Sequence, residues 1–189
     1  MQMQNDDGQL IAAYLEGDDN SLGFLVDRYL SDVYTFALRL TRDPQAAEDI
    51  AQNSFIKAWK HIRRYRQGSN FQKWIFAITR NTAIDWLRQK KEPAISSFEN
   101  EQGNKLLDTL ADNELLPDEL IARAEDAKFV GALLEQLDPH YREVLDLRYT
   151  SNLTFEQIGE ILRRPLHTVK SQHRRALALL RRLLQVEPA

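Results

Sequence analysis

The fold of the C-terminal half is decided by residues 153–175, which read LTFEQIGEILRRPLHTVKSQHRR. Thr154 is placed to cap a helix and Gln157 to complete a capping box with it. The apolar side of this short helix consists of Phe155, Ile158, Ile161 and Leu162. Residues 163–167 predict a turn, and Thr168 is expected to cap a second helix over 169–184. A helix, a short turn and a basic helix together predict a helix-turn-helix.

The start of the second helix carries side chains suited to the DNA major groove. Basic groups bind phosphates and guanine edges, and a serine adapts to several hydrogen-bonding partners. The residues expected to face outward are His167, Lys170, Ser171, Arg174 and Arg175. The alternative is a helical hairpin whose basic surface is merely solvated.

The rest of the chain also has helical periodicity, so we predict an all-α protein. A first long helix extends over 22–40, with Asn20 or Ser21 as its N-cap, and Asp43-Pro44 begins a second that continues to Ile62. A third helix has Trp74, Ile75, Ile78, Ile84 and Leu87 on its apolar side. After Pro117, helices are expected at about 118–136, 139–149, 154–162 and 167–186.

Residues 93–117 lose this periodicity and are rich in acids, serine and asparagine. They predict a flexible acidic linker. The expected architecture is therefore two small helical domains, residues 1–92 and 118–189, joined by this linker. Whether residues 1–19 fold onto the first domain is left open.

Charge is distributed in blocks, although the net charge of the 189 residues is only −3. Residues 57–91 hold ten bases and one acid, residues 92–126 ten acids and two bases, and residues 163–182 seven bases and no acid. Two basic blocks separated by an acidic one predict two surfaces that bind polyanions. Solvated helix faces are the alternative.

The first basic block has aromatic residues interleaved with its bases. A positive groove lined by aromatic faces holds unstacked nucleic-acid bases. The aromatic residues are Tyr65, Phe71, Trp74, Phe76 and Trp86. Trp74 and Trp86 are better explained as core residues. Phe71 and Lys73 are the stronger candidates for exposure.

The second predicted helix has a polar face opposite its apolar stripe. Asp49, Gln52, Asn53 and Lys60 lie there, beside Phe55 and Trp59, which we expect to be partly exposed. On composition alone this is either an ordinary solvated face or a docking surface.

Several classes of function lack the residues that they require. The chain has no cysteine, which excludes disulfides and thiolate chemistry and fits a cytoplasmic location. His61, His140, His167 and His173 lack the spacing of a helical metal site. No nucleophile motif or phosphate-binding loop is present, so neither enzymatic activity nor a cofactor or metal is expected. The longest apolar runs are too short for a membrane-spanning helix.

Three motifs in this order resemble the bacterial extracytoplasmic-function (ECF) sigma factors. They are AEDIAQNSFIKAW at 47–59, FQKWIFAITRNTAIDWLR at 71–88 and the helix-turn-helix at 153–175. The resemblance implies a two-domain initiation factor. Such a factor binds core RNA polymerase, at the clamp of its largest subunit and at its flap, and stabilises the melted minus-ten element of promoter DNA.

The resemblance also implies roles for individual residues. Docking on the polymerase clamp would use Asp49, Gln52, Asn53, Phe55 and Trp59. Binding of the minus-ten element would use Gly68, Ser69, Asn70, Phe71 and Lys73 in a base-capturing loop, and Arg80, Asn81, Asp85 and Arg88 on the following helix. Binding of the minus-thirty-five element would use His167, Thr168, Lys170, Ser171, Arg174 and Arg175.

The chain departs from the family pattern at three positions of the helix-turn-helix. His167 and Arg163 stand where glycine is usual, and Gln172 stands where arginine is usual. Arg163 is therefore expected to adopt a left-handed backbone at the end of the first helix. The changes at 167 and 172 bear on which promoter sequence is bound.

The hypothesis is thus a non-enzymatic sigma factor, with an anti-sigma factor as a partner that the resemblance suggests. Three rivals remain. A stand-alone helix-turn-helix regulator would bind duplex DNA tightly by itself, usually as a dimer. An enzyme acting on nucleic acid would need a nucleophile or metal cluster. A helical adaptor would not depend on Arg174 and Arg175.

Overall fold

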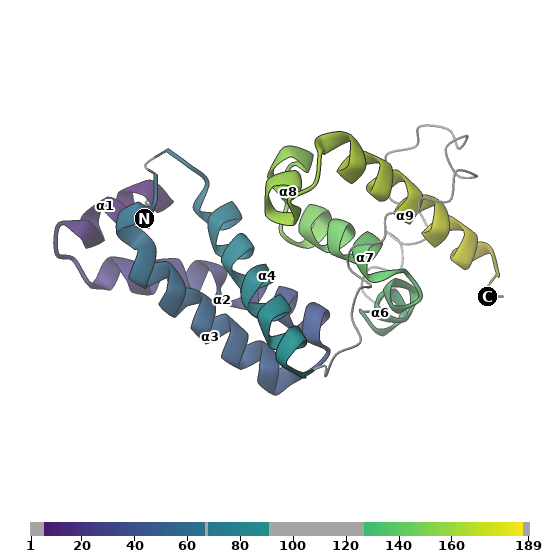
Figure 1. Cartoon of the computed structure of the whole chain (residues 1–189), viewed down its shortest axis with the longest axis horizontal. Helices are drawn as coiled ribbons and strands as arrows, with labels where there is room; N and C mark the ends of the chain where they lie inside the picture. The colour runs from purple at the N-terminus through teal and green to yellow at the C-terminus, as the bar shows by residue number, and fades with distance from the viewer. Residues whose placement is uncertain (1–5, 67, 91–126, 187–189) are drawn as a thin grey trace. The chain divides into compact units, whose positions relative to one another are not determined.

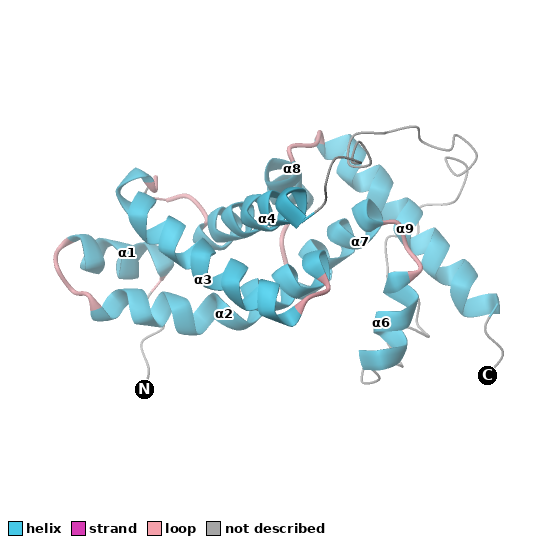
Figure 2. Ribbon diagram, turned by 60° about the horizontal axis from the view of Figure 1, so that its bottom comes forward, coloured by secondary structure: helices cyan, strands magenta, loops and turns pink. Residues whose placement is uncertain are grey.

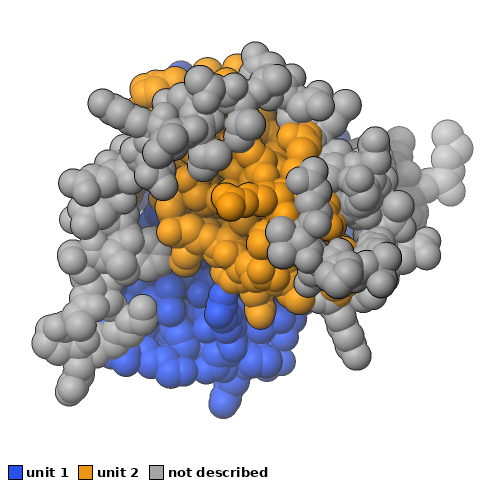
Figure 3. Space-filling view, turned by 90° about the vertical axis from the view of Figure 1, so that its right-hand side faces the viewer, with its two compact units in different colours: residues 1–94 blue, residues 95–189 orange. Residues whose placement is uncertain are grey.

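The computed structural model describes residues 6–66, 68–90 and 127–186. The chain divides into two compact units, residues 1–94 and 95–189, which Figure 3 colours separately. All regular structure in the described residues is helical, as predicted (Figures 1 and 2). The predicted linker at 93–117, and residues 118–126 of the helix predicted after it, lie outside the described residues.

The N-terminal unit is built from α1 (Asp7–Leu15), α2 (Asn20–Thr41), α3 (Pro44–His61), the short 3-10 helix η1 (Ile62–Arg64) and α4 (Phe71–Lys90). Helix α2 packs against α1, α3 and α4, and α3 also packs against α4. The core includes the fully buried side chains of Leu25, Val33, Ala47, Ile75 and Phe76. Helix α2 is therefore in contact with each of the other three α-helices described in this unit.

Helix α1 settles the question left open for the first residues of the chain. Leu10 and Ile11 are buried. The Asp7 carboxylate accepts hydrogen bonds from the Arg28 guanidinium and from the Tyr29 hydroxyl, the latter at 2.5 Å. Burial and this carboxylate raise the pKa of Tyr29, so its hydroxyl stays protonated and remains a donor. Residues 7–15 thus fold onto α2.

The start of α2 differs from the prediction of an Asn20 or Ser21 cap. The N-cap is Asp19, whose side chain makes no capping bond. The Asp18 carboxylate instead accepts from the backbone N–H of Asn20 at 3.1 Å and from the Ser21 hydroxyl at 2.7 Å. The cap prediction was therefore wrong: Ser21 lies inside the helix and is buried.

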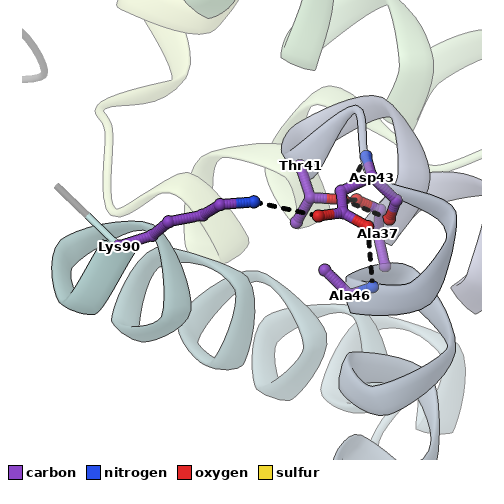
Figure 4. Close-up of polar contacts among 5 residues, drawn as sticks. All are labelled: Ala37, Thr41, Asp43, Ala46 and Lys90. Atoms are coloured by element: carbon purple, nitrogen blue, oxygen red, sulfur yellow. Dashed lines mark hydrogen bonds and ion pairs between the residues drawn. The ribbon is translucent and has the colours of Figure 1, made fainter.

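Asp43 begins α3 as predicted and also ties that start to the end of α4 (Figure 4). Its Oδ1 accepts from the backbone N–H of Ala46 at 3.2 Å, and its Oδ2 accepts from Lys90 Nζ at 2.9 Å. Pro44 occupies the first helical turn, where its missing N–H costs nothing. The Lys90 ammonium and the Ala46 N–H lower the pKa of the Asp43 carboxyl.

The C-terminal unit contains α6 (Ala127–Glu135), α7 (Pro139–Leu145), the π-helical turn η3 (Asp146–Thr150), α8 (Phe155–Leu162) and α9 (Leu166–Val186). Helix α9 packs against α6, α7 and α8. Its core includes Leu133, Leu137, Leu145, Ala176, Leu177 and Leu180. Within the described ranges, no helix has the length and apolar character needed to cross a bilayer.

Candidate nucleic-acid and partner surfaces

Helices α8 and α9 form the predicted helix-turn-helix. The Thr154 side chain accepts from the backbone N–H of Gln157 at 3.3 Å, and Gln157 Oε1 accepts from the N–H of Thr154 at 2.8 Å. The predicted capping box is confirmed. Arg163 ends α8 in the left-handed conformation, with φ 55° and ψ 44°, as predicted. Residues 163–165 then connect the two helices.

The second helix of this motif begins earlier than predicted. The N–H of Val169 donates to the carbonyl of Pro165 at 3.1 Å, which is a helical i to i+4 bond. Leu166, His167 and Thr168 therefore form the first turn of α9, and the prediction that Thr168 caps it was wrong. The reason is that the fixed φ of Pro165 is already suited to entering a helix.

The predicted groove-facing residues lie along the first three turns of α9. His167 and Lys170 are exposed, while Thr168, Ser171, Arg174 and Arg175 are half-buried. Leu166, which the sequence reasoning missed, is 39% exposed at the same end. The start of α9 thus offers basic, hydroxyl and apolar groups together.

Arg164 anchors the turn to two helices. Its Nη1 donates to Gln172 Oε1 at 3.1 Å, and its Nη2 lies 4.0 Å from Glu143 Oε2 on α7. Gln172 is buried, so its side chain is held inside the unit. Gln172, which stands where arginine is usual in the family, therefore lies inside the helix-turn-helix.

His173 on α9 is also buried, although it stands between basic residues in the sequence. Its Nε2 and the Tyr149 hydroxyl are hydrogen-bonded at 2.9 Å, and the Phe155 ring meets it edge-on at 4.9 Å between centroids. Burial and the nearby Arg148 guanidinium lower the pKa of His173 to about 4. The imidazole is therefore neutral at physiological pH. Sequence reasoning considered this residue only as a metal ligand.

The polar face of α3 is exposed as predicted. Asp49, Gln52, Asn53 and Lys60 all lie on the surface. Ile56, which was not predicted, is 48% exposed among them, because residues 49, 52, 53, 56 and 60 share one helix face. A helical-wheel reading would have found it.

One of the two aromatic residues near this face is less exposed than predicted. Phe55 is 5% exposed and belongs to the core, so the expectation of partial exposure was wrong. It lies one residue from the exposed face, and the helical rotation turns it inward. Trp59 is half-buried, as expected, and its ring lies 5.8 Å from that of Phe55.

The loop before α4 presents Gly68, Ser69 and Asn70, all exposed. Gly68 has φ 82°, a conformation that side chains disfavour. The Ser69 hydroxyl donates to the Arg66 carbonyl at 2.5 Å, and Asn70 Oδ1 accepts from the N–H of Lys73 at 2.7 Å, capping α4. Asn70 therefore has a structural role beside any role in binding.

Phe71 corrects the sequence-based prediction most clearly. It is 1% exposed, whereas we expected it to be a surface residue, and Lys73 is half-buried. The buried side of α4 consists of Phe71, Ile75, Phe76, Thr79, Thr82 and Ala83, so Ile75 is the one residue of the predicted apolar stripe that is buried. Threonines fit there because the hydroxyls of Thr79 and Thr82 each donate to the carbonyl four residues earlier, at 2.9 Å.

Trp74, Ile78, Ile84, Trp86 and Leu87 are consequently half-buried at the margins of α4. The candidate minus-ten residues of α4 lie farther out. Asn81, Asp85 and Arg88 are exposed at positions i, i+4 and i+7 of one face, and Arg80 beside them is half-buried. As for metal ions, the described ranges contain no group of three or more potential ligand side chains.

Comparison with known proteins identifies the family. Residues 25–92 match the family model for Sigma-70 region 2, and residues 133–182 match the model for Sigma-70 region 4. The ECF RNA polymerase sigma factor SigW of Bacillus subtilis is 30% identical over 172 residues, which cover 90% of this chain and 92% of SigW. The chain belongs to the ECF sigma factor family.

Other relatives of this sigma factor agree. The RNA polymerase sigma-H factor of Pseudomonas aeruginosa is 29% identical over 191 residues, covering 98% of this chain and 97% of the relative. The fold is shared with CnrH, solved in complex with the cytosolic domain of CnrY, at a TM-score of 0.68 and 22% identity over 96% of this chain and 99% of that one. As a sigma factor, the protein directs RNA polymerase to promoters, and sigma factors are initiation factors rather than catalysts.

Proposed function

We propose that the two units of this sigma factor bind different targets during initiation and that the chain has no catalytic activity of its own. The N-terminal unit docks on core polymerase and holds the melted minus-ten element. The C-terminal unit anchors the duplex minus-thirty-five element in the major groove. The observation that carries this proposal is the capped helix-turn-helix, whose second helix begins with exposed His167 and Lys170.

The polymerase surface in this proposal is the exposed face of α3. Asp49, Gln52 and Asn53 supply polar contacts, Ile56 supplies an apolar centre, and Trp59 borders the face. An apolar anchor surrounded by polar groups is the common plan of an interface whose energy is concentrated at its centre. The partner surface is the clamp of the largest polymerase subunit, and the flap would receive the C-terminal unit.

The minus-ten surface consists of the exposed loop at Gly68, Ser69 and Asn70 and the outer face of α4. Flipping a base out of the duplex costs a few kcal/mol, which contacts in the loop would offset. Asn81, Asp85 and Arg88 on the adjoining face would contact the same strand. Two weak sites on one polymerase-bound scaffold gain from high effective concentration, so no ATP is needed.

An anti-sigma factor would regulate this protein by covering the polymerase and DNA surfaces described above. The RpoE protein of Bartonella quintana, solved with the anti-sigma factor NepR, shares this fold at a TM-score of 0.65 and 22% identity over 89% of this chain and 99% of that one. A cytoplasmic location follows from the proposed work on polymerase and chromosomal DNA.

The test is transcription in vitro with core polymerase on a library of promoter fragments, with and without the protein. Start sites that require the protein define its promoter. The double variant Gln52→Ala, Asn53→Ala should remove these transcripts, because it truncates two exposed residues of the α3 face and leaves the core intact. Gln136→Ala, at an exposed position of the other unit, is the matched control and should transcribe normally.

Two results would contradict the proposal. If the α3 double variant still produces these transcripts, the α3 face is not the surface that docks on polymerase. A protein that yields no transcripts but shifts duplex DNA by itself would be a stand-alone helix-turn-helix regulator.

A further inference from the structure

Four aromatic rings surround Phe71. They are Tyr29 on α2, Trp59 on α3, Tyr65 after η1 and Trp74 on α4, with ring centroids 5.5, 6.3, 6.0 and 5.8 Å from that of Phe71. The Trp59 ring is stacked, with an interplanar angle of 14°, while Tyr65 and Trp74 meet Phe71 at 65° and 62°. We refer to these five residues as the Phe71 cluster. It joins three helices and the segment that leads into the loop.

The cluster is connected directly to the loop at 68–70. The Tyr65 hydroxyl donates to the carbonyl of Ser69, and the Tyr65 ring also packs on Trp74, 5.4 Å away. Phe71 itself follows Asn70, whose side chain caps α4. The loop is therefore fixed at one end by the α4 cap and in its middle by Tyr65, and Phe71 contacts both Tyr65 and Trp74.

The cluster also reaches the α3 face, because the Trp59 ring contacts both Phe71 and Phe55. Phe71 is almost completely enclosed, so it cannot itself stack on a base. A ring at this point limits the positions of Tyr65 and Trp74 through edge-on contacts, whereas an aliphatic side chain of similar volume would not.

We propose that Phe71 is a positioning residue for minus-ten binding: it acts through Tyr65 to hold the loop at 68–70 in its binding conformation and does not contact DNA. This inference rests on the proposed function of that loop. The buried Phe71 ring thus fixes the loop's conformation, and the same ring also packs on Trp59, which borders the docking face. Preorganising a binding loop raises affinity by reducing the entropy lost on binding.

The test compares Phe71→Leu with Phe76→Leu. Phe76 is the matched control because it is 0% exposed on the same helix and packs against Phe36, 5.3 Å away, outside the Phe71 cluster. Each variant is assembled with saturating core polymerase. Its affinity is measured for a fluorescent single-stranded oligonucleotide that carries the minus-ten sequence of a mapped promoter.

Phe71→Leu should weaken oligonucleotide binding about tenfold, because several ring contacts that hold the loop are lost together. Phe76→Leu should change this affinity less than about twofold, because its ring packs against Phe36 rather than against the rings of the Phe71 cluster. Core-polymerase affinity should stay within about twofold for both, since Phe55 still supports Trp59. Equal weakening by the two variants would overturn the inference, because the effect would then reflect general loss of packing.

Two further measurements keep the result interpretable. Fluorine NMR of the free protein labelled with 5-fluorotryptophan should show the Trp59 and Trp74 signals moving in Phe71→Leu, with Trp86 unmoved. Tyr65→Phe keeps the rings and removes only the bond to Ser69, so it should weaken oligonucleotide binding about threefold. No effect of Tyr65→Phe would also overturn the inference. If the wild-type holoenzyme does not bind the oligonucleotide, the proposed function of the loop fails, and the inference fails with it.

Discussion

At the residue scale, His173 shows how a position inside a basic segment can be part of the core. Its neighbours Arg174 and Arg175 are half-buried at the margin of α9, while the imidazole is 3% exposed and bonded to Tyr149. A buried imidazole near the Arg148 guanidinium resists protonation, because a second positive charge there would be neither solvated nor neutralised.

This environment predicts a pH dependence of stability. The folded-state pKa of about 4 lies below the ordinary value of 6.5, so the unfolded chain binds the proton more tightly. The contribution of His173 is therefore fully present above pH 6.5 and is lost as the pH falls towards 4. The free energy of unfolding should fall less over this range in His173→Gln than in the wild type, as urea denaturation would measure. His61→Gln, at an exposed position, is the control.

The pKa itself can be checked by NMR titration of the His173 ring. We expect a midpoint close to 4. A midpoint near 6.5 would show that the ring is accessible to water, and the stability prediction would fail with it.

The backbone conformation of Arg163 lowers the stability of the folded protein. A left-handed conformation, φ 55°, is unfavourable for a residue with a Cβ and free of strain for glycine. Arg163→Gly should therefore stabilise the protein by about 1 kcal/mol, as measured by urea denaturation. Arg182→Gly, at an exposed position inside α9, should destabilise it by about 1 kcal/mol. Destabilisation by Arg163→Gly would mean that the arginine side chain contributes more than its backbone costs.

At the element scale, the contact between α8 and the turn before α9 depends on a missing side chain. A Cβ on Gly159 would lie 2.9 Å from the carbonyl oxygen of Arg164 and 3.8 Å from Val169 Cγ2. The first atom belongs to the backbone, so it cannot move aside without shifting the turn. The helix-turn-helix is thus closed around a position that only glycine fits.

Gly159→Ala should accordingly destabilise the protein by about 1–3 kcal/mol through overpacking. Gly131→Ala on α6 is the matched control, since a Cβ there meets nothing within 4 Å. It should stabilise the helix by up to about 1 kcal/mol. Denaturation curves of the two variants should therefore move in opposite directions, and equal shifts would contradict the close approach at Gly159.

The Asp43 carboxylate caps the start of α3 and also pairs with Lys90 at the end of α4. Asp43→Ala removes the bond to Ala46 and the partner of Lys90, and should lower the stability of the protein. Asp19→Ala is the control, because the Asp19 side chain makes no capping bond, and its effect should be smaller. Thermal unfolding at pH 7 measures both.

The same carboxylate has a lowered pKa, so its contribution is present above its ordinary pKa of 3.8 and is lost as the pH falls through the lower folded-state value. The difference between the wild type and Asp43→Ala should therefore shrink below pH 4. A difference that stays constant with pH would mean that the cap does not depend on the charge.

At the scale of the whole molecule, charge is separated along a chain that is acidic overall. The segment 163–182 has seven bases and no acid, within a protein of net charge −3. Basic groups that replace counterions on DNA make binding weaker at higher salt, by a slope of about 0.9 per phosphate contact. The salt dependence of DNA binding therefore measures how many basic side chains contact phosphate groups.

Lys170→Gln should lower the slope of log affinity against log salt by about 0.9 for a duplex minus-thirty-five fragment. Lys60→Gln, which removes an exposed positive charge from the N-terminal unit, is the matched control and should leave the slope unchanged. Equal changes in both variants would indicate a general effect of net charge rather than a phosphate contact at Lys170.

The sequence alone determined most of the helices from residue 20 onward and the family of this protein. Helical periodicity, the Thr154 capping box, the Asp43-Pro44 start and the left-handed Arg163 are local features, governed by hydrogen bonds and sterics within a few residues, and each was predicted correctly. The ordered motifs were also sufficient for the family, because they occupy most of the chain.

Only the tertiary structure decided which side chains on those helices are enclosed. Phe71, Phe55 and Gln172 could each have faced solvent by sequence alone, and Ile56 could have been part of the core. Burial depends on which helices pack on either side of an element, and those neighbours come from distant parts of the chain. α4 lies against both α2 and α3, so its buried arc is wider than its apolar stripe and includes threonines whose hydroxyls bond to their own helix.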